Sequence, residues 1–174
     1  MTMTYVKKFF VLLIILIVTS TAIIKCSYSF TGASVPPHLN TIAIPSVIDR
    51  SGSGEFDIAT KLTELITRNF INDNTLQIGD RVNSDSILEC TITSLSDAPA
   101  VLSGGETITT RRITVSVRSV YKDLVKRQTV FERTFSSYGD YLTSGDIFEV
   151  RKNAIDEALD KIAEDILLGV VSNW

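Results

Sequence analysis

The strongest constraint on the fold of this chain is the stretch of residues 107–121, in which the side chains alternate in character with a period of two. Alternation of this kind predicts a β-strand with one face on a core and the other face in solvent. The positions predicted to face the core are Ile113, Val115, Val117, Ser119 and Tyr121. Residues 122–127 are a predicted turn, and residues 129–137 are the expected partner strand, with Phe131 and Phe135 on one face. The sequence therefore predicts a long β-hairpin.

Three further segments are predicted to be strands. The strongest pattern covers residues 87–95. The side chains of this strand that are predicted to share one face are Leu88, Cys90 and Ile92. Shorter β-rich runs cover residues 40–47 and 76–78. Pro45 has no backbone N–H to donate to a neighbouring strand, so it marks an edge position or the end of its strand.

Two segments have the apolar periodicity of amphipathic helices, residues 55–71 and residues 147–171. Ser53 is the expected cap of the first helix. In the second, Asp146 and Glu149 have the spacing of a capping box, with Asp in place of the usual Ser or Thr. The predicted apolar stripes are Ile58, Leu62, Leu65, Ile66 and Phe70 in the first helix and Ile155, Leu159, Ile162, Ile166 and Val170 in the second.

The order of these elements predicts an α+β fold. We expect a mixed sheet of four to five strands with both helices packed on one face, preceded by an N-terminal signal or anchor. The chain has 174 residues, of which 44% are hydrophobic and 21% charged. That length and composition suit one folded domain and a leader.

Residues 1–25 have the character of a secretory signal or a membrane anchor. Lys7 and Lys8 precede an apolar run at residues 9–18, which is shorter than the roughly 20 residues that span a bilayer as a helix. Cys26 follows, at the place where bacterial lipoprotein signals have the cysteine that receives a lipid. Lys25 stands where such signals have a small residue, so an uncleaved anchor with an unmodified Cys26 is the alternative.

These patterns divide the chain into three parts: the signal or anchor at residues 1–25, a linker at residues 26–39 and a globular domain at residues 40–174. The paired prolines Pro36 and Pro37 predict that the linker is a stiff spacer. A lipidated Cys26 and an uncleaved anchor would both place the domain on the far side of the inner membrane. A lipid on Cys26 implies the outer membrane, and an uncleaved anchor implies the inner membrane.

Basic side chains cluster along the predicted hairpin, although the domain is acidic. Residues 1–25 contain three lysines and no acidic residue, so the remainder has 14 basic against 20 acidic residues and a net charge of −6. An acidic domain argues against general nucleic-acid binding. Half of the remaining basic residues lie in the hairpin region: Arg111, Arg112, Arg118, Lys122, Lys126, Arg127 and Arg133. They are candidates for contacts with phosphates or an anionic lipid head group, or they protect the strands against aggregation.

No arrangement of residues typical of catalysis is found in the sequence. His38 is the only histidine, so a histidine-based metal site is not predicted. The chain has no glycine-rich phosphate loop, no Gly-x-Ser-x-Gly elbow and no Cys-x-x-Cys pair. Asp140, within Tyr-Gly-Asp-Tyr at residues 138–141, is predicted to form a turn rather than to act as a base. We therefore expect no enzyme activity, no metal and no cofactor.

Residues 26–45 carry the clearest resemblance to a known family. They read Cys-x-Tyr-Ser-Phe-Thr-Gly-Ala-Ser-Val-Pro-Pro-x-Leu-x-Thr-Ile-Ala-Ile-Pro and resemble the start of the LptE-type lipopolysaccharide-assembly lipoproteins. The segment Ser-Asp-Ser-Ile-Leu-Glu-Cys-Thr-Ile at residues 84–92 is similar to a strand of that family, with Cys90 in place of a usual glycine. The resemblance extends over nearly the whole chain after residue 25.

The resemblance implies an outer-membrane lipoprotein on the periplasmic side, anchored through a lipid on Cys26. Members of the family sit inside the LptD β-barrel, help that barrel to assemble and bind lipopolysaccharide during its delivery to the outer leaflet. They catalyse no reaction. The seven basic residues of the hairpin would then be candidates for the phosphates of lipid A. The alternative is a periplasmic interaction module similar to the CsgG or TolB N-terminal domains, acting in another envelope system.

Overall fold

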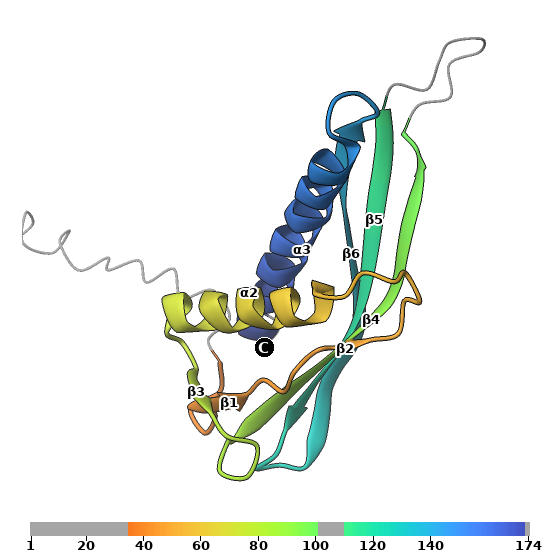
Figure 1. The fold of residues 1–174 in the computed structure, drawn as a ribbon. Helices are drawn as coiled ribbons and strands as arrows, with labels where there is room; N and C mark the ends of the chain where they lie inside the picture. The colour runs from red at the N-terminus through yellow and green to blue at the C-terminus, as the bar shows by residue number, and fades with distance from the viewer. Residues whose placement is uncertain (1–34, 101–109, 173–174) are drawn as a thin grey trace, which may run out of the picture. The chain divides into compact units, whose positions relative to one another are not determined.

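The predicted hairpin forms one side of the sheet in the computed structural model, which describes residues 35–100 and 110–172 (Figure 1). Its strands are β5 (Thr110–Asp123) and β6 (Gln128–Leu142), which pair antiparallel along their whole length. Every predicted inward position of β5 is buried: Ile113, Val115, Val117, Ser119 and Tyr121. The prediction of a turn around Asp140 is wrong, because β6 continues through it and Asp140 lies opposite Arg112.

Strand β4 (Ser86–Pro99) pairs antiparallel with the other edge of β5. The predicted inward residues of β4, which are Leu88, Cys90 and Ile92, are all buried. The register then shifts at Thr93, since Ile92 lies opposite Val117 and Ser94 lies opposite Ser116. This bulge changes the phase of the alternation. Leu95 therefore lies opposite the buried Val115, and Asp97 opposite the buried Ile113.

The N-terminal part of the sheet consists of three short strands. β1 (Thr41–Ala43) pairs in parallel with β3 (Gln77–Gly79) and with the start of β4. After Pro45 the chain returns to β4 as β2 (Ile48–Asp49), also in parallel. The strand order is β3-β1-β4-β5-β6, with β2 beside β4. The predicted mixed sheet is thus confirmed, and it has six strands because the N-terminal segment pairs with β4 twice.

The first predicted helix is α2 (Ile58–Asp73), and its apolar stripe, Ile58, Leu62, Leu65, Ile66 and Phe70, is buried. The helix begins three residues later than predicted. Ser53 does not cap it, because the Ser53 hydroxyl takes part in a local turn with Ser51. Asp57 precedes the helix without a side-chain capping bond, and Asn74 ends it in a left-handed conformation with φ of 56°.

The second helix, α3 (Ile147–Val171), begins and ends where the sequence predicts. The Asp146 carboxylate caps it by accepting hydrogen bonds from the backbone N–H groups of Phe148 and Glu149. Both helices contribute to the same hydrophobic core as the inward residues of the sheet, and Figure 1 shows them on one side of it. The predicted α+β architecture is therefore confirmed.

A close backbone contact fixes α3 on β6. A Cβ atom added at Gly139 would lie 2.1 Å from the carbonyl oxygen of Ala154, so only glycine allows this approach. Further along, Gly169 of α3 packs against the ring of Phe135. Phe131 and Phe135 are partly buried against the core, as predicted. The face of the sheet opposite to α3 carries no helix of the described residues.

The predicted leader at residues 1–25 and Cys26 lie outside the described residues. The described residues belong to one of two units of the chain, Ala33–Trp174. Within them, packing begins ahead of β1, because Leu39 is buried in the core.

Candidate functional site

The helix-free face of the sheet carries a ladder of ion pairs between neighbouring strands. The guanidinium of Arg112 donates two hydrogen bonds to Asp140, at 2.7 and 2.8 Å. Further along β5, Arg118 pairs with Glu132 of β6 at 2.6 Å, and the hydroxyls of Ser116 and Ser136 lie 2.9 Å apart. These contacts make this part of the face polar.

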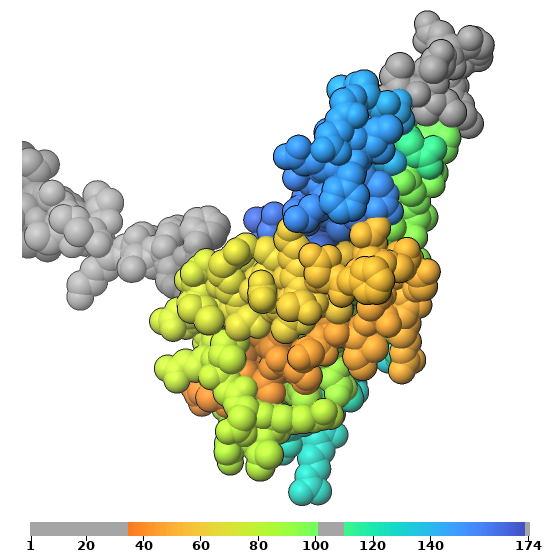
Figure 2. Space-filling view, in the orientation of Figure 1, coloured from red at the N-terminus to blue at the C-terminus, as the bar shows by residue number. Residues whose placement is uncertain are grey.

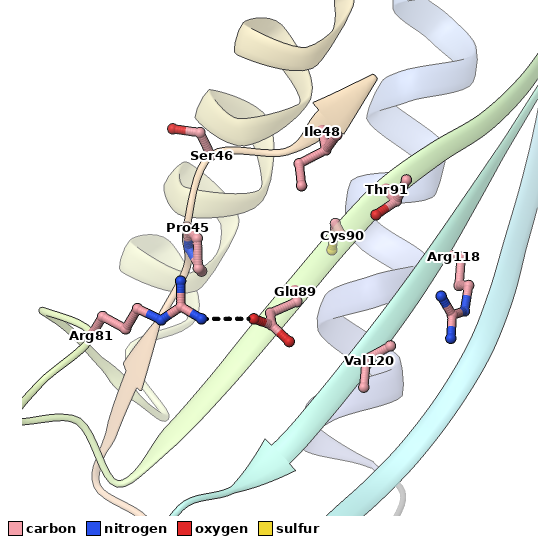
Figure 3. A pocket seen from close by; sticks show the side chains of 9 residues that line it. All are labelled: Pro45, Ser46, Ile48, Arg81, Glu89, Cys90, Thr91, Arg118 and Val120. Atoms are coloured by element: carbon pink, nitrogen blue, oxygen red, sulfur yellow. Dashed lines mark hydrogen bonds and ion pairs between the residues drawn. The ribbon is translucent and has the colours of Figure 1, made fainter. Parts of the chain in front are cut away.

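A pocket of about 270 Å³ opens on this face, where the chain between β1 and β2 runs alongside β4, on the side away from β5 (Figure 3). Its lining residues are Pro45, Ser46, Ile48, Arg81, Glu89, Cys90, Thr91, Arg118 and Val120. Three sequence-distant segments therefore build one site: the chain after β1, the loop between β3 and β4, and the middle of the sheet.

The carboxylate of Glu89 in this pocket pairs with two cations. One carboxylate oxygen accepts a hydrogen bond from the Arg81 guanidinium at 3.1 Å, as the dashed line in Figure 3 shows. The other oxygen accepts a hydrogen bond from Lys122 Nζ at 2.5 Å. The neighbouring Arg118–Glu132 pair adds one cation and one carboxylate. The three cations are thus Arg81, Arg118 and Lys122, and the two carboxylates are Glu89 and Glu132. The site is positive by one charge on a domain that is acidic overall.

Apolar side chains lie beside these cations. Ile48 is 52% exposed, and Pro45 and Val120 complete an apolar wall of the pocket. A guanidinium can donate two parallel hydrogen bonds to a phosphate, and exposed aliphatic carbon favours contact with other apolar groups. The pocket therefore suits an anionic ligand that has an apolar part.

Cys90 does not supply a reactive group to the pocket. Its side chain is buried, and its Sγ lies 3.3 Å from the Ser119 hydroxyl. Burial raises the pKa of the Cys90 thiol to about 11, so the thiol is protonated at neutral pH and is a poor nucleophile. Within the described residues, no three His, Cys, Asp or Glu side chains are placed to hold a metal ion.

A family model described as LptE, lipopolysaccharide-assembly, matches residues 39–168. The chain belongs to the LptE family. The match covers every strand and nearly all of α3, so the predicted membership is confirmed. No curated protein sequence matches this LptE-family chain.

Solved structures show the same fold as this LptE-family chain at low sequence identity. Protein XCC0632 from Xanthomonas campestris has a TM-score of 0.60 and 13% identity, over 81% of this chain and 91% of that chain. The hypothetical protein CT253 from Chlamydia trachomatis has a TM-score of 0.57 and 10% identity, over 76% and 98%. Rare lipoprotein B from Shewanella oneidensis has a TM-score of 0.51 and 17% identity, over 73% and 92%.

The seven basic residues singled out from the sequence do not form one cluster. Arg112, Arg118 and Lys122 point to the helix-free face, where each pairs with a carboxylate. Arg111 and Arg133 alternate with them and belong to the helix side. The last two, Lys126 and Arg127, lie in the β5–β6 turn. Of the seven, Arg118 alone lines the pocket, and Lys122 reaches it through Glu89.

Arg111 belongs to a structural network between the sheet and α3. Asp97 accepts hydrogen bonds from Arg111 Nε at 2.8 Å, from the Tyr141 hydroxyl at 2.8 Å and from Arg151 Nε at 3.3 Å. Arg151 also pairs with Glu55. Burial opposes ionisation of Asp97, but the hydrogen bonds from Tyr141 and Arg111 outweigh it and hold the pKa of Asp97 below its ordinary value. Arg111 therefore joins the sheet to α3 and does not line the pocket.

Arg81 is the residue of the pocket that the sequence did not indicate. It lies in a polar loop outside the hairpin, and only the parallel pairing of β1 with β3 and β4 brings this loop beside Glu89. Among the described residues, no helix has the length and apolar character required to cross a membrane.

Proposed function

We propose that this LptE-family protein is a non-enzymatic component of lipopolysaccharide assembly that pairs with an LptD-like outer-membrane β-barrel. In this role it assists assembly of the barrel and delivers lipopolysaccharide to the outer leaflet. The observation that carries the proposal is the family match over residues 39–168, which covers nearly all of the described domain. The predicted division into a leader (residues 1–25), a linker (26–39) and the domain (40–174) is part of the proposal.

We infer that lipopolysaccharide binds at the pocket on the helix-free face. Arg81 and Arg118 would contact phosphates of lipid A, while Ile48 would contact an acyl chain. The positive balance of the site and its apolar wall support this assignment. Arg112 and Lys122 extend the same face on either side of Arg118 along β5.

The anchor in this proposal is a lipid on Cys26, which holds the domain at the periplasmic face of the outer membrane. Intact mass of the mature protein tests this assignment. An N-terminal diacylglyceryl-cysteine at residue 26 supports it, whereas a protein that retains residues 1–25 would indicate an inner-membrane anchor instead.

The partner and the ligand are tested separately. Purification of the full-length protein from native envelopes is expected to recover an LptD-like barrel, and depletion is expected to lower surface lipopolysaccharide. Normal surface lipopolysaccharide after depletion would contradict the proposal and would favour a periplasmic module of another envelope system.

Binding at the pocket is tested with purified lipopolysaccharide. The Arg81→Gln/Arg118→Gln variant is expected to bind it more weakly than the wild type. Arg50→Gln/Lys152→Gln is the matched control, because both residues are exposed cations that line no part of the pocket. Equal losses in the two variants would show that net charge, and not the pocket, governs binding.

A further inference from the structure

The β5–β6 turn exposes aliphatic side chains next to cations. Its residues are Leu124, Val125, Lys126 and Arg127. Leu124 is 37% and Val125 56% exposed, and Val82 of the loop between β3 and β4 is 89% exposed. Glycine, proline, asparagine and aspartate, which usually form hairpin turns, do not occur at these four positions. The geometry of a hairpin turn therefore does not explain why aliphatic and basic residues occupy these four positions.

The turn and the loop between β3 and β4 form one end of the domain. The N–H of Leu124 donates a hydrogen bond to the carbonyl oxygen of Asp85 at 2.8 Å, which joins the two segments. In Figure 2 the two segments lie at the same end, where the turn protrudes. Their exposed aliphatic side chains can therefore contact one surface together.

The conformation of the turn is fixed. The carboxylate of Asp123 accepts a hydrogen bond from the Lys126 N–H at 2.8 Å. Arg127 has a φ of 55°, in the left-handed region that favours glycine or asparagine. An arginine in this conformation costs stability that glycine would not, and such a cost is typical of residues retained for function.

The two cations of the turn form no salt bridge in the described part of the chain, although the Lys126 ammonium is near enough to Asp123 to help lower the pKa of that carboxyl. Arg112, Arg118 and Lys122 on the same hairpin each form a salt bridge, whereas Lys126 and Arg127 form none within residues 35–100 and 110–172. Their charges therefore face solvent on a domain that is otherwise acidic. The tip of the turn is therefore complementary to an anionic surface.

The N-terminal segment joins the domain at this same end. His38 Nε2 lies 2.7 Å from Asp123, the residue before the turn, and the N–H of Asn40 donates a hydrogen bond to Asp85. Val35 is nine positions after Cys26 in the sequence, so the two residues can lie at most about 30 Å apart. If Cys26 is anchored in a membrane as proposed above, this end of the domain is held close to the lipid.

We propose that the β5–β6 turn, together with Val82, contacts the surface of an anionic phospholipid bilayer. Lys126 and Arg127 bind lipid phosphates, and the side chains of Leu124 and Val125 enter the interfacial layer. This contact is distinct from the lipopolysaccharide pocket on the sheet. It depends on the proposed function only through the anchor at Cys26.

The test uses the full-length protein in phosphatidylcholine vesicles with and without phosphatidylglycerol. Backbone hydrogen exchange of residues 124–128 is expected to slow only when phosphatidylglycerol is present and to recover its solution rate in high salt. The variant Lys126→Gln/Arg127→Gln is expected to lower the equilibrium constant for contact between the turn and the membrane by roughly 25-fold, since each removed charge contributes about fivefold. Val125→Ser is expected to weaken the protection of the turn in phosphatidylglycerol vesicles at low salt, because it removes an apolar side chain from the interfacial layer.

Arg50→Gln/Lys152→Gln removes the same charge elsewhere and is expected to leave the protection of the turn unchanged. Exchange of the β5 core amides in solution serves as the folding control for every variant. Equal protection in neutral and anionic vesicles, or no protection in either, would overturn the proposal. Protection by purified lipopolysaccharide but not by phosphatidylglycerol vesicles would also overturn it. None of these readouts depends on recovery of the barrel, so failure here is distinguishable from failure of the proposed function.

Discussion

The Nε2 atom of His38 lies 2.7 Å from a carboxylate oxygen of Asp123, across a sequence separation of 85 residues. The Asp123 side chain is fully buried, whereas His38 is partly exposed. This contact joins the chain ahead of β1 to the end of β5. With the buried Leu39 that follows, it fixes the point at which the N-terminal segment meets the domain.

Replacement of His38 by alanine is expected to lower the free energy of unfolding by about 1–3 kcal/mol, because it removes a partner from a buried carboxylate. Chemical denaturation measures this loss. The same variant is expected to speed hydrogen exchange at residues 38–41 more than in β5. An unchanged unfolding free energy would show that the contact with Asp123 contributes nothing to the fold.

The stabilisation by Asp123 is also expected to depend on pH. Burial alone would raise the pKa of Asp123, but the hydrogen bonds from His38 and from the Lys126 N–H outweigh it, so the pKa lies below its ordinary value. A carboxylate with a lowered folded pKa stabilises the fold above its unfolded pKa of about 3.9, and this contribution is lost as the pH falls through the folded pKa. The stability difference between the wild type and Asp123→Asn is therefore expected to shrink below about pH 4. A difference that stays constant would contradict the assignment.

Gly139→Ala is expected to destabilise the packing of α3 on β6. The added Cβ would lie 2.1 Å from the backbone carbonyl oxygen of Ala154, so the helix must move. Overpacking of this kind costs about 1–3 kcal/mol of unfolding free energy. Thr134→Ala, at an exposed position of the same strand, is the control and is expected to change stability by less than about 1 kcal/mol. Equal effects would show that strand propensity, and not the contact with α3, decides the outcome.

Tyr141→Phe is expected to raise the pKa of Asp97, because the Tyr141 hydroxyl donates a hydrogen bond to the ionised carboxylate at 2.8 Å. Loss of this bond costs about 0.5–1.5 kcal/mol of stability. Titration of the Asp97 carboxyl by NMR measures the shift directly. An unchanged pKa in the variant would mean that Arg111 and Arg151 alone hold the carboxylate ionised.

Sequence patterns predicted the elements whose side chains repeat over many residues. The alternation from Ile113 to Tyr121 and the limits of α3 follow from such repeats, and both are confirmed. The bulge at Thr93 and the short strand β2 could not be predicted in this way, because strand pairing decides them. Arg81 was missed for the same reason, since the crossing from β3 to β4 determines which loop lies beside Glu89.

Glu89→Gln is expected to strengthen binding of purified lipopolysaccharide to the pocket. The change removes one of two carboxylates and frees Arg81 and Lys122 from their shared partner. The gain is expected to be roughly fivefold, from about 1 kcal/mol for one unit of charge, and to disappear in high salt. Glu164→Gln, an exposed position on α3, gives the same change of net charge away from the pocket. Weaker binding by Glu89→Gln would show that the carboxylate orients the two cations for the ligand.

Cys90 is expected to be unreactive towards thiol reagents while the domain is folded. In a Cys26→Ser background it is the only thiol of the chain. Burial raises its pKa to about 11, so only roughly one thiol in a thousand is ionised at pH 8. Modification should therefore follow unfolding of β4 and become fast in denaturant. Ser96→Cys in the same background places an exposed thiol on the same strand and should react at once. Equally fast modification of native Cys90 would show that β4 opens without global unfolding, which would contradict the tight packing of this strand between β1 and β5.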